Sequence, residues 1–404
     1  MRKFLSVMLF AMMMLGLAAP AMAGGVVELE YVIHKSESEA IEGMHKVIDA
    51  FNAENPGIHV TLTPPPDFAT VIQTRAQTNE MPDLFSCVTN NMYEIMFRDG
   101  LIMDLTGQPF LANVADETLA LSTYESRNWR MPYSLSYYGL YVRTDIFEQQ
   151  GLAFPTTWDE LMDVCAKLQA AGITPFALPD KTMVYQRMER VMGIISDNDE
   201  DFRKIASGEL AAADSKVLTV YAASAVKIAD NMTEESYGSE YTESYQQLLA
   251  GQAAMTINGQ WSLLTLKNFD PNVQVALIPL PNPTGEVSRV PVSIDTSFCI
   301  SSSTKHPEEA LKFLEFLSRK ETAQMYTDIE GSPNVIKGVQ YNVPELEKVT
   351  EKMNAGEIFI SLNSIWPSGL RKELGDAATN LVIDKDVDTF LSEAEYIIDE
   401  YYNK

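Results

Sequence analysis

Short apolar strands alternate with amphipathic helices through most of this chain. Residues 28–33 and 58–62 have the pattern of strands, and residues 41–51 between them carry apolar side chains at helical spacing. A helix over residues 67–79 and a short apolar strand over residues 82–88 follow. Strands and helices that alternate in this way are typical of βαβ units, in which helices cover a parallel sheet. The pattern therefore predicts an α/β fold with a mostly parallel sheet.

A second series of the same kind begins with a predicted strand at residues 139–142. Thr157 and Glu160 have the spacing of a capping box, which predicts a helix that begins after Thr157 and ends near Gly172. A run rich in proline, at residues 279–285, separates this series from a further strand and helix. At 404 residues the chain exceeds the size at which single cores stop growing, so two domains are expected.

The amino terminus has the pattern of a secretory signal. Two cations, Arg2 and Lys3, precede an apolar run over residues 4–17, and the small residues around Ala23 form a cleavage site. Gly24 follows that site, so we expect no lipid-anchor cysteine after cleavage. No later apolar run approaches the roughly 18 residues that a membrane helix requires. We therefore expect residues 1–23 to be a cleaved signal peptide and the mature protein to be periplasmic.

Composition excludes several functions. A formal net charge of −26 repels nucleic acid and anionic lipid, while a hydrophobic content of 46% is that of a folded chain with large cores. The three cysteines lie far apart in apolar stretches, which favours buried free thiols. The four histidines show no metal-ligand spacing, and no hydrolase, phosphate-binding or dinucleotide-binding motif occurs. The sequence therefore predicts no metal, no cofactor and no enzymatic activity, although a carboxylate pair of a secreted glycosidase stays open.

Several short motifs occur in a characteristic order along the whole mature chain. They are Phe51-Asn52-Ala53-Glu54-Asn55-Pro56-Gly57-Ile58, Met81-Pro82-Asp83-Leu84, Met131-Pro132-Tyr133, Thr156-Thr157-Trp158-Asp159-Glu160-Leu161, Gly259-Gln260-Trp261 and His306-Pro307-Glu308-Glu309-Ala310. In this order, and behind a signal peptide, they resemble the extracellular solute-binding proteins of ABC importers, in the family 1 cluster around maltose-binding protein.

The resemblance implies a periplasmic-binding-protein-like fold of type II, with two α/β lobes, crossing hinge segments and a ligand cleft between the lobes. The N-lobe would hold residues 24–132 and 281–332, and the C-lobe residues 133–280 and 333–404. Ligand would bind at the carboxyl ends of strands in the cleft. The protein would be a monomer that captures a mono- or oligosaccharide and delivers it to the transmembrane subunits of an ABC permease.

The resemblance also implies which side chains touch a sugar. Trp261 matches a tryptophan that stacks on sugar in the maltose-binding relatives, and Trp366 matches a second aromatic residue of the cleft. Ser136 and Tyr138 belong to a stretch that lines the cleft in relatives, and strand alternation would turn both toward the ligand. Asn90 matches a polar contact position at which relatives have a carboxylate, with a helix cap as the alternative.

Three more candidates follow from their positions at strand ends or crossings. Ser36 and Glu37 open the first loop between a strand and a helix, where Glu37 can accept sugar hydroxyl groups or act as a helix cap. Asp295 interrupts an apolar strand just inside the second crossing. Arg371 is expected to be a surface cation of a helix, with an ion pair to a cleft carboxylate as the alternative.

Other solutes compete with sugar on this scaffold. A polyamine would need aromatic residues and several acids, which the chain contains. A glycerol phosphate would favour an arginine or a glycine-rich helix start in the cleft, and neither is evident from the sequence. Carbohydrate therefore stands first, with a polyamine or glycerol phosphate as the alternative ligand.

Overall fold

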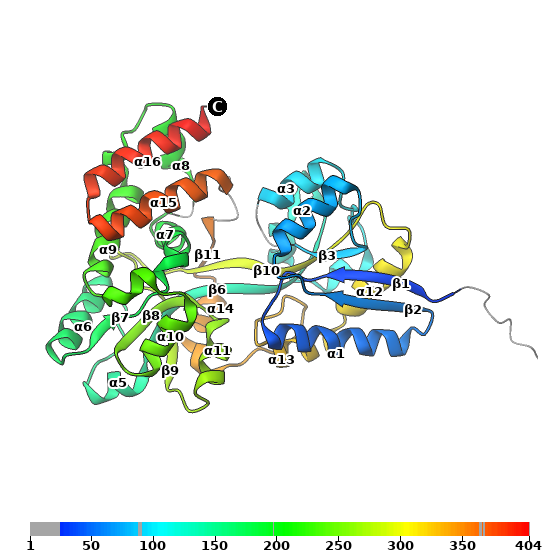
Figure 1. The fold of residues 1–404 in the computed structure, drawn as a ribbon, viewed down its shortest axis with the longest axis horizontal. Coiled ribbons are helices and arrows are strands. Elements are labelled where there is room, and N and C mark those ends of the chain that lie inside the picture. Colours follow the sequence, from blue (N-terminus) through cyan, green and yellow to red (C-terminus); the bar gives the residue numbers. More distant parts are fainter. Residues whose placement is uncertain (1–24, 88–90, 197, 363–365, 367, 404) are drawn as a thin grey trace, which may run out of the picture.

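The computed structural model describes residues 25–87, 91–196, 198–362, 366 and 368–403. The predicted signal peptide and Asn90 lie outside these residues. Two helix-rich parts lie at opposite ends of an elongated molecule, and the long strands β6 (Met131–Arg143) and β10 (Val290–Ile300) run between them (Figure 1). Within the described residues, no helix combines the length and apolarity needed to cross a membrane.

The remaining strands are short. They are β1 (Val27–Val32), β2 (Ile58–Thr63), β3 (Leu84–Ser86), β4 (Thr123–Tyr124), β5 (Arg127–Asn128), β7 (Thr174–Phe176), β8 (Ala253–Gly259), β9 (Val275–Ile278) and β11 (Ile358–Ile360). Nine of the described strands form one sheet, in which the order β2-β1-β3-β10-β6-β8-β7 is flanked by β11 on β10 and β9 on β6. The hairpin of β4 and β5 stands apart.

Helices cover both parts of this sheet. The α-helices are α1 (Ser38–Glu54), α2 (Phe68–Thr78), α3 (Asn91–Arg98), α4 (Asp116–Leu121), α5 (Thr144–Gln149), α6 (Trp158–Ala170), α7 (Asp180–Ile195), α8 (Glu200–Ala206), α9 (Lys216–Ala229), α10 (Tyr241–Leu249), α11 (Ser262–Phe269), α12 (Pro307–Leu317), α13 (Lys320–Glu330), α14 (Glu347–Asn354), α15 (Ser368–Asp384) and α16 (Val387–Tyr402). Short 3₁₀ helices are η1 (Pro109–Asn113), η2 (Ala212–Asp214), η3 (Glu234–Gly238) and η4 (Pro344–Leu346).

The sheet is mixed, so the prediction of a mostly parallel sheet was wrong. The pairs β1–β2, β1–β3, β7–β8 and β10–β11 are parallel, as βαβ units require. The strands β6 and β10 are antiparallel to each other, β10 is antiparallel to β3, and β6 is antiparallel to β8 and β9. Sequence periodicity signals single strands and carries no information on the direction in which a connecting strand pairs.

The buried apolar side chains of the described residues form four clusters. Two of them surround β1 and β3, and include residues of α1, α12 and α13. The other two surround β7, β8 and β9, and include residues of α6, α7, α9 and α15. The chain passes between these two groups of clusters along β6, along β10 and between Val339 and Tyr341. The second passage thus lies within β10, later in the chain than the lobe boundary between residues 280 and 281 that was expected from the sequence.

Local sequence signals account for several helix ends. The Thr157 hydroxyl accepts a hydrogen bond from the Glu160 N–H, and the Glu160 carboxylate accepts one from the Thr157 N–H, which confirms the capping box of α6. The Asp67 carboxylate caps α2 by accepting a hydrogen bond from the Thr70 N–H, and Asn79 ends that helix in a left-handed conformation with φ 58°. The predicted strand at residues 139–142 is only part of β6, because Pro132 and the polar residues after it obscure the strand pattern.

Candidate functional site

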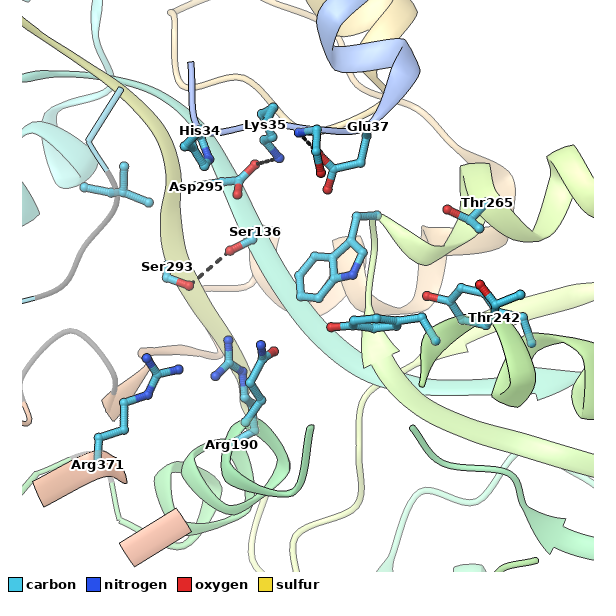
Figure 2. Close-up of a pocket in the computed structure, with 16 residues that line it drawn as sticks. His34, Lys35, Glu37, Ser136, Arg190, Thr242, Thr265, Ser293, Asp295 and Arg371 are labelled. Carbon is cyan, nitrogen blue, oxygen red and sulfur yellow. Dashed lines mark hydrogen bonds and ion pairs between the residues drawn. The ribbon is translucent and has the colours of Figure 1, made fainter. Parts of the chain in front are cut away.

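A cavity of about 520 Å³ lies where the two groups of core clusters meet along β6 and β10. Residues 34–37, which connect β1 to α1, and Asp295 of β10 line one side, and Arg190 of α7 and Arg371 of α15 line the other (Figure 2). We call it the central cavity. Its volume falls within the roughly 300 to 1,000 Å³ typical of small-molecule sites.

Trp261 lies at the end of β8 and supplies an aromatic wall of the central cavity. Its indole ring lies directly over Gly259, since a Cβ at Gly259 would come within 2.0 to 2.3 Å of three indole carbons. The glycine therefore leaves the space that the ring occupies. The indole is half-buried, and its centroid is 6.2 Å from that of the buried Tyr138 ring. The Trp261 indole thus gives the central cavity an apolar surface beside the polar side chains of its wall.

Lys35 contacts two carboxylates, those of Asp295 and Glu330, and Figure 2 shows the contact with Asp295 at the upper side of the central cavity. Its Nζ lies 2.5 Å from Asp295 Oδ2 and 3.4 Å from Glu330 Oε1, and the Lys35 side chain is only 7% exposed. Burial alone would raise the pKa of Asp295, but the Lys35 ammonium lowers that pKa below its usual value. Burial and the same ammonium lower the pKa of His34 to about 4. His34 is therefore neutral at physiological pH.

Hydroxyl groups and the side chain of Gln260 lie beside this ion cluster. The Ser136 and Ser293 hydroxyl oxygens are 3.1 Å apart across β6 and β10, and both serines line the central cavity (Figure 2). Gln260, next to Trp261, accepts a hydrogen bond from the Tyr137 N–H and donates one to the Ser332 hydroxyl. Gln260 thereby ties the end of β8 to β6, which passes between the core clusters, and to Ser332, which follows α13.

Two arginines form the opposite side of the central cavity. Arg190 is 5% exposed, and its Nη1 donates a hydrogen bond of 2.8 Å to Glu189 Oε2. Arg371 donates from Nε and Nη2 to the two oxygens of the same carboxylate. Burial raises the pKa of Glu189, while Arg371 and Arg190 act to lower it. The two guanidinium groups therefore share one fully buried carboxylate.

The structure brings five of the eight candidate residues from the sequence into one place. Trp261, Ser136, Ser36, Glu37 and Asp295 all line the central cavity. The backbone of Glu37 occupies the N-cap position of α1, but its carboxylate accepts from the Ser36 N–H and makes no capping hydrogen bond to the helix. Both alternatives for Glu37 therefore apply in part. Its backbone takes the helix-cap position, and its side chain lines the cavity.

The other candidates are placed differently. Trp366 is 1% exposed and stacks on Phe202 at 5.0 Å inside the largest core cluster, so it lies away from the central cavity. Tyr138 shares the side of β6 that carries Ser136, as alternation predicts, but its ring is covered by Trp261 and Arg190 and its hydroxyl donates to the Ile257 carbonyl. It supports the cavity wall and does not line it.

Arg371 pairs with Glu189 and lines the central cavity, so the expectation of a surface cation was wrong and the alternative of an ion pair to a carboxylate beside the cleft describes it better. Other lining residues escaped the sequence analysis. Arg190, Tyr241 and Tyr245 also line the central cavity. These residues lie within helices, where an inward-facing polar side chain has no local signature. The one sequence signal that could have indicated Arg190 is the occurrence of Arg187, Glu189 and Arg190 in a helix whose other residues near them are mostly methionine, valine and isoleucine.

The chemistry of the lining suits a polyhydroxylated solute. Carboxylate, hydroxyl and guanidinium groups provide acceptors and donors, and indole and phenol rings provide flat apolar surface. Within the part of the chain that the structure describes, no three histidine, cysteine or acidic side chains are arranged to hold a metal ion.

Comparison with known proteins matches this chain to one family. A model of the bacterial extracellular solute-binding proteins matches residues 35–324, which is well over half of the chain. The chain belongs to this family. It is 27% identical over 380 residues to the multiple sugar-binding protein of Streptococcus mutans, an alignment that covers 89% of this chain and 87% of the relative.

Solved structures of the family share the fold. The solute-binding protein RafE in complex with raffinose superposes with a TM-score of 0.81 at 22% identity, and the match covers 93% of this chain and 99% of RafE. A sugar transporter protein of Bacillus licheniformis in complex with stachyose has a TM-score of 0.71 at 17% identity, with 92% and 98% covered. The fold is therefore that of the type II solute-binding proteins, as predicted.

Proposed function

We propose that this protein captures a carbohydrate outside the cytoplasm and delivers it to the membrane subunits of an ABC importer. The family consists of solute-binding proteins, and the relatives named above bind sugars according to their names. The observation that carries the proposal is the central cavity, in which the Trp261 indole stands beside hydroxyl and carboxylate groups. An indole face suits the C–H face of a pyranose ring, and the polar groups suit its hydroxyls.

Each side of the central cavity would then have its own task. Trp261 would stack on the ring, and Ser136, Ser36 and Glu37 would exchange hydrogen bonds with hydroxyl groups. Asp295 is already bonded to Lys35, so it would accept from a sugar hydroxyl through its remaining lone pairs. These roles rest on the position of each side chain in the wall of the cavity.

The transport step would be closure of two lobes around the sugar. One lobe would be built on β1–β3 and the other on β7–β9, and the cavity is lined from both groups of elements. Sugar that contacts both lobes binds the closed form better and shifts the population toward it. The permease would recognise that closed form. Closure would bend the connections at β6, β10 and residues 339–341, where the chain passes between core clusters.

Secretion, the absence of a lipid anchor and the monomeric state belong to the same proposal. Cleavage after Ala23 would release a soluble periplasmic protein, and a single chain contains both sides of the central cavity. The protein would release its sugar chemically unchanged and would need no cofactor. A polyamine is disfavoured as ligand because Arg190 and Arg371 share the single carboxylate of Glu189, which leaves excess positive charge at that end of the cavity.

The proposal is tested with refolded protein, from which any bound solute has been removed. Thermal shift and calorimetry would be run with mono- and oligosaccharides, polyamines and glycerol phosphates. We expect one class of sugar to bind, and Trp261→Ala to weaken that binding by more than about tenfold because it removes the stacking surface. Tyr396→Ala, at a residue 66% exposed on α16, is the matched control and should leave affinity unchanged. Failure of every sugar to bind to folded protein would overturn the proposal.

A further inference from the structure

At one end of the central cavity, the cationic side chains of the wall outnumber the carboxylates. Arg190 and Arg371 face a single carboxylate, Glu189, which is 0% exposed and bonded to both. The nearest other ion pair on α7, between Arg187 and Asp180, is complete in itself. Whether Glu189 is ionised or neutral, the cluster of Arg190, Arg371 and Glu189 keeps a net positive charge. We call this group the arginine cluster.

Both guanidinium groups are held in place before any ligand arrives. The Arg190 guanidinium lies 5.0 Å from the centre of the Tyr138 ring, and the Arg371 guanidinium lies 4.7 Å from that of Tyr185. Such cation–π contacts, together with the hydrogen bonds to Glu189, fix the planes of the two head groups. Figure 2 shows both head groups directed toward the cavity from the same side. A ligand group that binds there meets donors whose rotamers are already fixed.

Donor atoms remain available in the arginine cluster. The bonds to Glu189 use Nη1 of Arg190 and the Nε and Nη2 atoms of Arg371. Among the described residues, no hydrogen bond uses Nη2 of Arg190 or Nη1 of Arg371. An acceptor group of a ligand in the cavity can therefore bind these terminal nitrogens without displacing Glu189.

The opposite end of the cavity has the reverse balance. Lys35 is a single cation bonded to both Asp295 and Glu330, and Glu37 adds a further carboxylate. The cavity is therefore negative near residues 35–37 and positive near the arginine cluster. A ligand that matches this arrangement carries hydroxyl groups toward Lys35 and Asp295 and an anionic group toward the arginines.

We propose that the sugar bound in the central cavity carries an anionic substituent, which the guanidinium groups of Arg190 and Arg371 bind. This inference rests on the proposed function, since it specifies the class of sugar that the same cavity takes. Carboxylate, sulfate and phosphate groups share the chemistry required, because each presents oxygens that a guanidinium binds in pairs. A uronic acid residue, a sulfated sugar or a sugar phosphate would each satisfy it.

The test compares matched sugars by calorimetry on refolded protein. The panel pairs galacturonate oligosaccharides, sulfated oligosaccharides and hexose phosphates with their neutral counterparts, and includes glycerol 3-phosphate as an anion without a sugar ring. We expect at least one anionic sugar to bind about ten- to a hundredfold more tightly than its neutral counterpart, the range of a hydrogen bond to a charged group. Arg371→Gln should abolish most of that preference and reduce affinity for the neutral sugar less.

Two further variants separate binding from folding. Lys372→Gln removes a cation from the next position of α15, where the side chain is 76% exposed and pairs with Asp376, and it should keep the preference. Arg371→Lys keeps the charge beside Glu189 but loses the planar fork, so it should retain part of the preference. The ratio of the wild type's affinities for the anionic and the neutral sugar tests the inference even if a variant does not fold.

Each outcome decides something. A preference for an anionic sugar that Arg371→Gln removes supports the inference. Equal affinity for neutral and anionic sugars would overturn it while the proposed function stands. Tightest binding of glycerol 3-phosphate, or no binding of any sugar to folded protein, would overturn the inference and the proposed function together.

Discussion

Replacement of Lys35 by methionine is the perturbation whose energetic cost follows most directly from the structure. The side chains of Lys35, Asp295 and Glu330 are 7%, 16% and 5% exposed, and Lys35 Nζ is the cation that contacts both carboxylates. Methionine preserves most of the length of the side chain and removes the charge. After the change, Asp295 keeps only a 3.5 Å contact from the Ser134 hydroxyl, whereas Glu330 keeps its two bonds from Ser332.

The expected cost at pH 7 is about 3 to 5 kcal/mol of unfolding free energy, the loss that follows when one partner of a buried ion pair is removed. The carboxylates can avoid burial as ions only by taking up protons. Each pH unit between the pKa and the working pH costs about 1.4 kcal/mol per proton taken up. In the wild type the pKa of Asp295 is lowered, so its stabilising effect is intact at both pH 7 and pH 5 and is lost only at lower pH. In Lys35→Met the ammonium is gone and burial raises the pKa of Asp295, so this carboxylate takes up a proton more readily at pH 5 than at pH 7. The difference between wild type and Lys35→Met should therefore shrink from pH 7 to pH 5.

Urea denaturation at pH 7 and pH 5 measures both effects. The matched control is Lys181→Met, because Lys181 forms an ion pair of 2.7 Å with Glu240 on the surface, where the two side chains are 56% and 53% exposed. Water screens that pair, so the control should change stability little at either pH. A Lys35→Met variant as stable as the control, or one whose deficit grows toward pH 5, would refute the reasoning.

Two further predictions concern the cavity wall and the thiols. Gly259→Ala places a methyl group within 2.0 to 2.3 Å of the Trp261 indole, so the ring must leave its position and sugar affinity should fall by about tenfold or more; unchanged affinity in calorimetry would show that the ring's position is unimportant. None of the three cysteines forms a disulfide and all three are buried, so a thiol reagent should label none of them in native protein and three after unfolding. Rapid labelling of the native protein would contradict the buried positions.

Much of the fold was predictable because its signals are local. The capping box of Thr157 and Glu160 and the cap of α2 depend on side chains a few residues apart, and both helices begin where expected. The long strand β6 was underestimated, because the pairing of residues 131–138 with β10 decides their conformation. Pro132 pairs at a position where the register of β10 shifts, which is where a sheet tolerates proline.

The candidate site was predictable where it is made of strand ends, of loops and of polar residues in the two long strands, such as Ser136 and Asp295. Ser36, Glu37 and Trp261 follow strands, and that position alone directs them toward a common edge of the sheet. Arg190 and Arg371 come from two helices far apart in the sequence, and only the packing of α7 against α15 places both beside Glu189. Stacking of Trp366 on Phe202 depends on the same kind of packing, so an aromatic residue near a proline gave no indication that it would be buried.

The most direct test of the account is a crystal structure of the protein with the tightest-binding sugar from the panel. The account predicts that the intact sugar occupies the central cavity, with a ring on the Trp261 indole and hydrogen bonds from the Arg190 and Arg371 side. A sugar bound elsewhere, for example in the cavity lined by Phe154 and Val287, would contradict the assignment of the site. A hydrolysed sugar would contradict the proposal that the protein only binds and delivers it.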